Sequence, residues 1–475
     1  MNNQNVLQRK KPEYRKASQC INDWLAVELF LTSDQITDQA RICMDCGVPF
    51  CHGYGCTLGN VIPEFNELVA MGRWAEAWNI LTLTNPFPEF TARICPALCE
   101  GSCVAGINEE PVNIRQIEYN IVEQAFQTGL AKPALPSHRK QENVAVVGSG
   151  PAGLAVAWKL NQKGYTVTVF ESAEKPGGLL RYGIPDFKLE KWVIDRRIKL
   201  MQEEGITFKT SVTIGSDISS SYLHRTFDAV VLAGGARTPR QLNVPGGDLN
   251  GVHYALPYLT LQNRINGGEN VSDQTLISAK DKSVVVIGGG DTGSDCLGTA
   301  LRQGAKKVVQ IEIMPKPPLV RSSETPWPEW PYKLRESSSH KEGGERKWSV
   351  MTKKIVGNEG KVSEVRCCEV KWGKDENGGK NPIEIPGSEF TLKAELVLIA
   401  MGFTGPGCVS SAEEFRLERS NNGFIWSSEE GVTSHEGVFA TGDITKGPSL
   451  VVKAIADGLD CADTVEKFIR KKNNA

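Results

Sequence analysis

The sequence predicts an α/β protein in which one parallel-sheet domain is inserted in another, with a mainly helical domain in front of both. A glycine-rich turn that occurs twice, each time between an apolar strand and a helix, predicts the two sheet domains. Seven cysteines between residues 43 and 103 set the N-terminal region apart. We expect the helical domain at 1–140, the first sheet domain at 141–250 and 396–475, and the inserted domain at 251–395.

The composition and charge are ordinary for a globular protein. Of the 475 residues, 40% are hydrophobic and 23% are charged, and the formal net charge is −2. A chain this close to neutral gives no reason to expect nucleic acid or an anionic membrane as a partner. The N-terminal segment lacks the apolar core of a signal peptide, and no apolar run is long enough to cross a bilayer. We therefore expect a cytoplasmic protein with no membrane span.

Residues 1–140 are expected to form helices joined by loops rich in proline and cysteine. Apolar residues recur at helical spacing over 62–83 and 114–126. Residues 132–140 have the composition of a linker, and the first strand–turn–helix pattern begins after them, at Val144.

The two glycine-rich turns lie at residues 148–153 and 288–293, and each leads through a helix to a strand that ends on an acid. In such turns the glycines permit the bend, let the backbone approach a pyrophosphate, and let the helix pack on the strand. The helix N-terminus favours the anion, and the acid accepts hydrogen bonds from a ribose. Each copy therefore predicts a Rossmann-like, nucleotide-binding domain. The candidate residues are Gly148, Gly150, Pro151, Ala152, Gly153 and Glu171 in the first copy, and Gly288, Gly290, Asp291, Thr292, Gly293 and Glu312 in the second.

The segments on both sides of the second turn indicate that its domain is an insertion. Apolar strands that end in glycine are expected at 227–235 and 394–402, and a short strand at 437–443 precedes a closing helix at 449–467. Residues 320–350, rich in Trp and Pro and then charged, are expected to be a long loop.

Gly442 and Asp443 lie between the last strand and the closing helix. An aspartate at this place suits a hydrogen bond to a ribityl chain, and the helix N-terminus would stabilise negative charge on a reduced flavin ring. An ordinary Gly-Asp turn explains the same two residues when they are taken alone.

The N-terminal cysteines favour metal binding. Thiols stay reduced in a chain that is not exported, so a disulfide framework is not expected. The spacings differ from that of a simple ferredoxin, and structural zinc is an open alternative on spacing alone. The seven are Cys43, Cys46, Cys51, Cys56, Cys95, Cys99 and Cys103, whereas Cys20, Cys296, Cys367, Cys368, Cys408 and Cys461 are expected to be inert and buried.

Two nucleotide sites beside metal-binding thiols suggest electron transfer. A nicotinamide gives two electrons together, an iron–sulfur cluster takes one at a time, and a flavin can do both. Zinc carries no electrons, so this combination favours iron–sulfur clusters. Hydride transfer to a flavin needs no acid/base pair, and the six histidines show no clustering, so no catalytic residue is predicted.

Several segments together resemble the pyridine-nucleotide–disulfide oxidoreductase superfamily: GSGPAGLAVAWKL, KPGGLLRYGIP, VVLAGGA, AMGF and FATGDITKGPSLVVKAIADG. The resemblance implies that the first turn binds FAD together with Gly178, Leu179, Gly442 and Asp443. It implies that the inserted turn binds NAD(P)H.

The N-terminal segments RICMDCGVPFCHGYGCTLGNVIPEFNELV and EEPVNIRQIE resemble the small (β) subunits of glutamate synthase, and so does the region after the second turn. The N-terminal part of dihydropyrimidine dehydrogenase shares the arrangement. The resemblance implies two 4Fe–4S clusters with interleaved ligands. Cys43, Cys46, Cys51 and Cys103 would hold one cluster, and Cys56, Cys95 and Cys99 the other. Glu118 would take the remaining place, unless it is a solvated helix glutamate.

The resemblance implies an electron-input subunit. NAD(P)H would reduce FAD, and the clusters would pass electrons to a large (α) subunit that carries a glutaminase and FMN and forms L-glutamate from 2-oxoglutarate and L-glutamine. Two alternatives remain open: an NAD(P)H:acceptor oxidoreductase of the ferredoxin type with another partner, and a zinc-stabilised nucleotide-binding scaffold. Glu312 favours NADH because a carboxylate repels the 2′-phosphate of NADPH, while Lys316 and Arg321 nearby could rescue NADPH binding.

Overall fold

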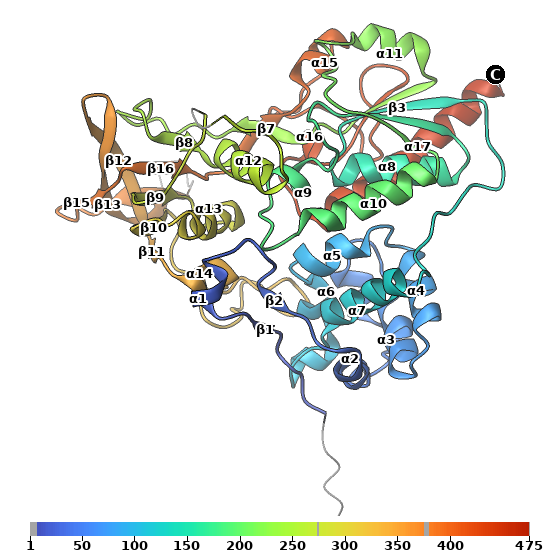
Figure 1. Ribbon diagram of the computed structural model, residues 1–475, viewed down its shortest axis with the longest axis horizontal. Coiled ribbons are helices and arrows are strands. Elements are labelled where there is room, and N and C mark those ends of the chain that lie inside the picture. Colours follow the sequence, from blue (N-terminus) through green and yellow to red (C-terminus); the bar gives the residue numbers. More distant parts are fainter. Residues whose placement is uncertain (1–6, 273–274, 375–379, 475) are drawn as a thin grey trace, which may run out of the picture.

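A computed structural model describes residues 7–272, 275–374 and 380–474. Figure 1 shows a helical N-terminal domain, a parallel-sheet domain against it, and a second sheet domain beside both. Phe87 and Phe90 of the N-terminal domain belong to the same hydrophobic core as Leu154 and Ile194 of the first sheet domain. These two domains are therefore one packed unit.

The N-terminal domain consists of short helices. The stretch 62–83 forms two helices, because the chain turns at 71–73, and the helix expected at 114–126 runs from Ile114 to Gln127. Within the described residues, no helix is both long and apolar enough to cross a membrane. The elements are β1 (Glu13–Tyr14), α1 (Ala17–Cys20), β2 (Glu28–Leu29), α2 (Ser33–Ala40), α3 (Ile62–Ala70), α4 (Trp74–Thr82), α5 (Pro88–Ile94), α6 (Leu98–Gly101) and α7 (Ile114–Gln127), with a π-helix at Cys51–Gly55 and a 3-10 helix at Val104–Ile107.

The first sheet is parallel, with the strand order β18-β6-β3-β4-β5. β18 comes from near the C-terminus and pairs with β6, so two distant parts of the chain complete one sheet. The closing helix α17 packs along α8. The elements are β3 (Asn143–Val147), α8 (Pro151–Gln162), β4 (Thr166–Phe170), α9 (Leu179–Tyr182), α10 (Lys191–Glu203), β5 (Thr207–Lys209), α11 (Ser220–Thr226), β6 (Ala229–Leu232), α15 (Val409–Glu414), β18 (Val438–Ala440), α16 (Asp443–Lys446) and α17 (Val451–Asn473).

The second sheet is also parallel, with the order β11-β10-β9-β16-β8. β16 lies between β9 and β8, so this sheet continues beyond residue 395, where the sequence put the end of the inserted domain. The chain passes between the sheet domains through an antiparallel pair, β7 and β17. The elements are β7 (Ala236–Pro239), β8 (Val252–Tyr254), α12 (Ala255–Asn266), β9 (Ser283–Ile287), α13 (Asp291–Arg302), β10 (Lys307–Glu312), α14 (Ser338–Glu342), β11 (Glu345–Trp348), β16 (Leu396–Ile399) and β17 (Phe403–Pro406).

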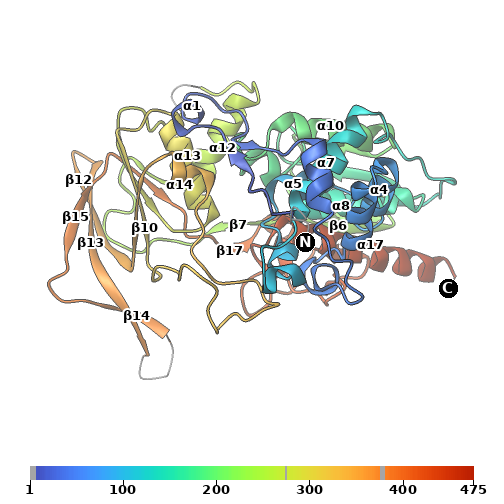
Figure 2. The ribbon, with the colours of Figure 1, turned by 90° about the horizontal axis from the view of Figure 1, so that it is seen from below.

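An antiparallel sheet that the sequence did not predict covers one side of the second sheet. Val365 and Cys367 on it share a hydrophobic core with Val285 and Ile311 of the parallel sheet. Figure 2 shows its β13–β14 ribbon extending away from the rest of the molecule. The strands are β12 (Val350–Asn358), β13 (Lys361–Lys374), β14 (Lys380–Glu384) and β15 (Phe390–Lys393).

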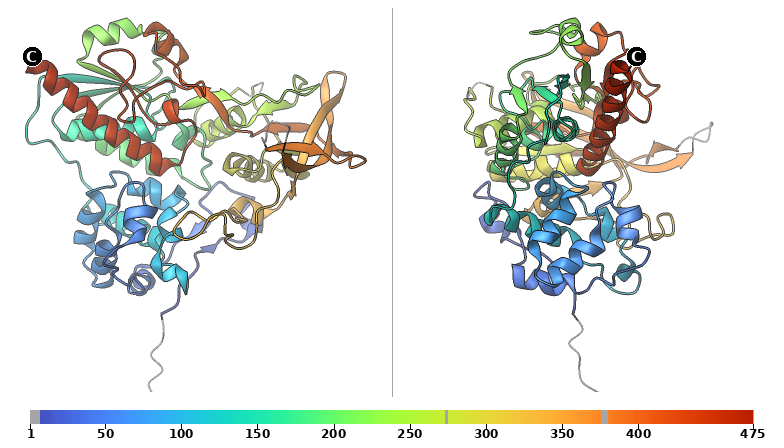
Figure 3. Two further views of the ribbon diagram at one scale, coloured as in Figure 1. Left: turned by 180° about the vertical axis from the view of Figure 1, so that it is seen from behind. Right: turned by 90° about the vertical axis from the view of Figure 1, so that its right-hand side faces the viewer.

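A long connection, the strap (residues 313–337), runs from the second sheet to the N-terminal domain and back (Figure 3). Arg321 Nη2 donates to the carbonyl oxygen of Gly101 at 2.9 Å, and Ser102 Oγ donates to the carbonyl oxygen of Pro328 at 2.7 Å. The strap therefore corresponds to the long loop expected from the sequence. The loop ends earlier than expected, because α14 and β11 follow.

Candidate cofactor-binding sites

The first glycine-rich turn brings three backbone segments into direct contact. Gly148 has a φ of 106°, and a Cβ there would lie 2.5 Å from the carbonyl oxygen of Ala233 on the next strand. A Cβ at Gly153 would lie 2.0 Å from the carbonyl oxygen of Gly148. No larger residue fits at either position, so the start of α8 is held close to the end of β3.

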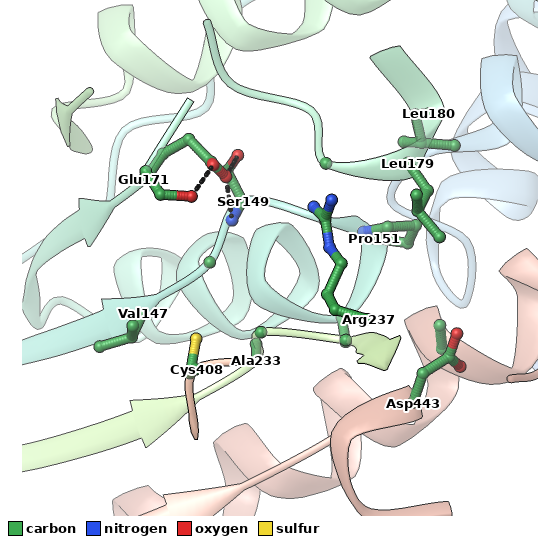
Figure 4. Close-up of a pocket in the computed structure, with 18 of the residues that line it drawn as sticks. Val147, Ser149, Pro151, Glu171, Leu179, Leu180, Ala233, Arg237, Cys408 and Asp443 are labelled. Atoms are coloured by element: carbon green, nitrogen blue, oxygen red, sulfur yellow. Dashed lines mark hydrogen bonds between the residues drawn. The ribbon is translucent and has the colours of Figure 1, made fainter. Parts of the chain in front are cut away.

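A cavity of about 330 Å³ lies over this turn (Figure 4). Gly153 and Gly442 do not line it, but each supports its wall: a Cβ at Gly442 would lie 2.7 Å from the Cβ of Ala152. The predicted residues that line the cavity are Gly148, Gly150, Pro151, Ala152, Glu171, Gly178, Leu179 and Asp443.

Two acids of this cavity are fixed in place. Glu171 is 4% exposed, and its carboxylate accepts from the Ser149 amide at 3.1 Å, from the Ser149 hydroxyl, and from the Ala173 amide at 2.8 Å. Asp443 accepts from Ser449 Oγ at 2.7 Å, and burial raises the pKa of its carboxyl to about 6.

Sequence reasoning missed two side chains of this cavity, both visible in Figure 4. Arg237 on β7 is the one cationic residue that the described part of the chain contributes to the lining, and it also lines a second cavity at the other sheet. Cys408 was expected to be an inert buried thiol, but it also forms part of the wall. Burial raises the pKa of the Cys408 thiol to about 11, so the thiol stays protonated at neutral pH.

The second glycine-rich turn repeats the geometry of the first. Gly288 has a φ of 125°, and a Cβ there would lie 2.2 Å from the carbonyl oxygen of Ala400. Glu312 accepts from the Gly289 amide at 2.6 Å and from the Met314 amide at 2.9 Å. Both acids therefore bind the amide that follows the first glycine and the amide two residues beyond themselves.

The second turn has a brace that the first turn lacks. Gln310 Nε2 donates to the carbonyl oxygen of Gly288 at 2.7 Å, and His340 Nε2 lies 2.8 Å from Gln310 Oε1. Ser337 Oγ contacts His340 Nδ1 at 3.1 Å and Ser294 Oγ at 2.5 Å. This chain of contacts ties the end of the strap to the turn and to helix α13. Nothing in the sequence marked it.

A second cavity, of about 350 Å³, lies at the carboxyl ends of β8 and β16. Thr292 is the one predicted nucleotide-binding residue of the second turn that lines it. Tyr254 and Phe403 supply aromatic surface, and Arg237 joins it to the first cavity.

The seven N-terminal cysteines divide between two small cavities. The thiols that the resemblance assigned to one cluster line one cavity, and those assigned to the other line the second, together with Glu118. In the described parts of the chain, no three metal-binding side chains meet closely enough to hold a single ion. The first group, around what we call the outer cavity, is Cys43, Cys46, Cys51 and Cys103, and the second, around the inner cavity, is Cys56, Cys95 and Cys99.

Glu118 on α7 is buried, with 6% of its surface exposed, so it is not a solvated helix glutamate. Its Oε1 accepts from Thr91 Oγ1 at 2.5 Å and from Asn85 Nδ2 at 2.7 Å. Burial raises the pKa of its carboxyl to about 7, against the lowering effect of these hydrogen bonds.

Neighbouring residues connect the cavities in a series. Ile94 lines the cavity over the first turn, called the first-turn cavity from here on, and the next residue, Cys95, lines the inner cavity. In the same way, Val451 of α17 lines the first-turn cavity and Val452 lines the inner cavity. Ile62 lines both the inner and the outer cavity. The inner cavity therefore lies between the first-turn cavity and the outer cavity.

Comparison with known proteins gives the family. Residues 142–458 match the pyridine nucleotide-disulphide oxidoreductase family, and residues 20–130 match dihydropyrimidine dehydrogenase domain II, a 4Fe–4S cluster domain. The glutamate synthase (NADPH) small chain of Mycobacterium tuberculosis is 48% identical over 97% of this chain and 94% of its own length. That of Bacillus subtilis is 43% identical over 98% and 97%. The chain belongs to the glutamate synthase small-chain family.

The names of the relatives differ in the nucleotide, and a solved structure supports the fold. The glutamate synthase (NADH) of Schizosaccharomyces pombe is 43% identical over 97% of this small chain, which spans 22% of that longer protein. The structure of Mycobacterium tuberculosis FprA in complex with NADPH aligns with a TM-score of 0.57 over 70% of this chain and 86% of its own, at 20% identity. The chain is thus an oxidoreductase with a two-nucleotide fold and a 4Fe–4S domain, and the zinc scaffold is set aside.

Proposed function

We propose that this small chain is the electron-input subunit of a glutamate synthase, which takes electrons from NAD(P)H and passes them to a large subunit. The observation that carries the proposal is the series of cavities. The first-turn cavity, the inner cysteine cavity and the outer cysteine cavity adjoin in that order. FAD accepts two electrons together and releases them singly, and 4Fe–4S clusters carry them singly, so the series has the chemistry of a conduit.

The first-turn cavity is proposed to bind FAD. Gly150 opens helix α8 at the cavity wall, so free amides of the helix would face the diphosphate, and Arg237 would add a positive charge there. Glu171, fixed by its hydrogen bonds, would accept from the adenosine ribose. Asp443 would accept from the ribityl chain.

The two cysteine cavities are proposed to bind one 4Fe–4S cluster each. The four thiols of the outer cavity are a complete ligand set, whereas the inner cavity offers three thiols and the Glu118 carboxylate. Glu118 is buried in the wall of that cavity, which supports it as the fourth ligand.

The second turn is proposed to bind NADH in preference to NADPH, and this preference rests on Glu312. Its carboxylate is held by two amides at the strand end, where the 2′ position of the adenosine ribose is expected. Arg321 is directed to backbone carbonyls of the strap and the N-terminal domain, and Lys316 lies over the Trp348 ring, 5.0 Å from its centroid. The names of the relatives divide between NADPH and NADH, so they do not support the preference.

The partner is proposed to be a large subunit that carries a glutaminase and FMN, and we place the complex in the cytoplasm. A reducing compartment keeps the seven thiols available for clusters. The second candidate, a ferredoxin-type oxidoreductase with another partner, uses the same cavities, and only the identity of the acceptor separates the two proposals.

The test of this proposal uses anaerobically purified chain, alone and with a glutamate synthase large subunit from the same organism. We expect bound FAD and about eight iron and about eight sulfide per chain. The chain alone should oxidise NAD(P)H with ferricyanide and form no glutamate, and the large subunit should restore glutamate formation. A chain that forms glutamate alone, or a preparation without flavin, would refute the proposal.

A variant test separates the two clusters. Cys46→Ser should lose about half of the iron and keep FAD, because Cys46 lines the outer cavity only. Unchanged iron in this variant would contradict the assignment of the outer ligands. Cys20→Ser is the matched control, since Cys20 is buried in a separate core and should leave the iron content as it is.

A further inference from the structure

Asn66 is a buried amide in the wall of the outer cavity. It lies on α3, its side chain is 0% exposed, and it lines the cavity beside the four thiols. The rest of the lining is apolar, with Ile62, Val104 and Ile114 among it. Asn66 is therefore, among the described residues, the one polar side chain in this wall apart from the thiols.

Neither polar atom of the Asn66 side chain has a partner. Nδ2 and Oδ1 are both buried and find no hydrogen bond among the described residues. Such groups are rare in folded proteins, because burying an amide without a partner costs free energy. Two other buried donors in this region, His52 Nδ1 and Trp327 Nε1, also lack a partner, but neither of those side chains lines the cavity.

Asn66 is the one side chain of the described residues in which two polar atoms are both buried and unpaired. Asn113 Oδ1 and Gln124 Oε1 of this domain also lack a partner, but neither residue lines a cysteine cavity. Around the inner cavity the amides are paired. There, Asn60 Oδ1 accepts from Thr84 Oγ1 at 2.9 Å, and Asn85 Nδ2 donates to Glu118 at 2.7 Å. Among the described residues, a side chain with both polar atoms unpaired is thus found only at the outer cavity, and the group that it faces is whatever the four thiols hold.

We propose that Asn66 Nδ2 donates a hydrogen bond to a sulfur atom of the iron–sulfur cluster bound by Cys43, Cys46, Cys51 and Cys103, and so raises the reduction potential of that cluster. The proposal rests on the proposed function. The donor stabilises the extra negative charge that the reduced cluster carries, and hydrogen bonds to sulfur are one of the factors that set cluster potentials. The outer cluster would then be a better electron acceptor than the same cluster without the donor.

The experiment is a redox titration of the full chain, loaded with both clusters and monitored by electron paramagnetic resonance. Asn66→Leu and Asn66→Val remove the donor, and the first of these keeps a side chain of nearly the same volume. Both variants should keep the native iron and sulfide content. One cluster should shift to a more negative potential, while the other keeps its native value.

Two controls assign the effect. The reduction potential that shifts should be the one that is absent from Cys46→Ser, because that variant should retain only the inner cluster. Asn120→Leu removes a buried asparagine on α7 that donates to the Leu31 carbonyl, away from both cysteine cavities, and should move neither potential. An unshifted potential in Asn66→Leu with full iron content would overturn the inference while leaving the proposed function intact.

If both substitutions prevent the outer cluster from binding, a measurement on the native protein still tests the inference. A hydrogen-bonded amide proton exchanges with deuterium and couples magnetically to the reduced cluster. Pulsed resonance spectra of the native chain in D₂O should lose a proton coupling from the outer cluster. A spectrum in which the outer cluster has no exchangeable proton would also overturn the inference, and a native chain without iron would instead refute the proposed function.

Discussion

The two glycine-rich turns have the same backbone and different surroundings. Each is closed by an acid that accepts two amide hydrogen bonds, Glu171 in the first and Glu312 in the second. The first turn forms a wall of the first-turn cavity, which Ile94 of the N-terminal domain also lines. The second contributes only Thr292 to its cavity, and the strap braces it through Gln310 and His340.

The difference teaches that the shared pattern specifies a nucleotide turn, while the environment decides what kind of ligand each turn can serve. A cofactor that stays bound needs an enclosing cavity, and residues from both parts of the first domain build one. A nucleotide that leaves after each cycle suits a turn that contributes little to the cavity and is held rigid by the protein itself.

The largest effects are expected from closing each turn with a side chain. Gly153→Val and Gly293→Val would place a Cβ about 2 Å from the carbonyl oxygens of Gly148 and Gly288, so the helix start must move. Gly153→Val should lose most of the bound FAD, measured by absorbance per chain. Gly293→Val should keep FAD and lose most NAD(P)H oxidation. A variant of the second turn that lost FAD equally would contradict the separation of the two sites.

A change of about tenfold is expected in nucleotide selectivity. Glu312→Ala removes a carboxylate that would repel the 2′-phosphate of NADPH. The repulsion between two like charges is large enough to change the ratio of kcat/KM for the two nucleotides by about one order of magnitude. The native chain should show the higher kcat/KM with NADH, and the variant should narrow the difference. Glu171→Ala, in the equivalent place of the first turn, should leave the ratio unchanged. A native preference for NADPH would refute the role given to Glu312.

A smaller change is expected when the brace is removed. His340→Ala deletes one hydrogen bond to Gln310, which is worth roughly 1 kcal/mol, so the KM for the nucleotide should rise about fivefold with little change in kcat. The FAD content should not change, because the brace contacts the second turn and not the first. His224→Ala, at the surface of the first sheet domain, is the control and should alter neither value.

The pH dependence of the brace follows from burial, which lowers the pKa of His340 to about 4. The ring is neutral above this value, so the KM effect of His340→Ala should be constant from about pH 6 to pH 8. As the pH falls from about 6.5 toward about 4, the unfolded chain binds a proton that the folded chain does not, so the native protein loses stability. His340→Ala should lose less over the same range, measured by thermal unfolding.

The smallest effect is expected at Cys408. Its thiol lies in the wall of the first cavity, but its raised pKa keeps it protonated. Cys408→Ala should change the affinity for FAD by less than about threefold, and iodoacetamide should label the native thiol slowly at pH 7. Rapid labelling that releases FAD would show that the cavity opens more readily than its packing indicates.

The parallel strands and the glycine turns could be predicted from the sequence because each is a local pattern. β3 and β9 are continuous apolar runs that end at glycine, which is how a strand buried on both faces reads. The antiparallel sheet was missed because β12 is interrupted by register shifts after Thr352 and Val356, which break the alternation of buried and exposed residues. The boundary near residue 395 was early because the strand order within a sheet is not a local property.

The candidate site was predictable where a residue type alone carries the chemistry. Clustered cysteines indicate metal binding and glycine-rich turns indicate nucleotide binding by residue type alone. The division of the seven thiols between two clusters came from a resemblance. Arg237, Gln310, His340 and Asn66 are common residues whose roles depend on which segments meet around them. Such contacts join residues far apart in the chain, so no spacing in the sequence could mark them.

The insertion of one sheet domain in the other sets an order of events during synthesis. The ribosome releases the last strand of the second sheet, β16, well before β18, Asp443 and α17, which complete the first. A nascent chain can therefore hold a finished inserted domain beside a first sheet whose outer edge, β6, still lacks its neighbour. If the first-turn cavity holds FAD as proposed, flavin loading waits until translation is nearly complete, because Asp443 and residues of α17 line that cavity. Until then, the open edge of β6 exposes backbone groups that another strand could pair with.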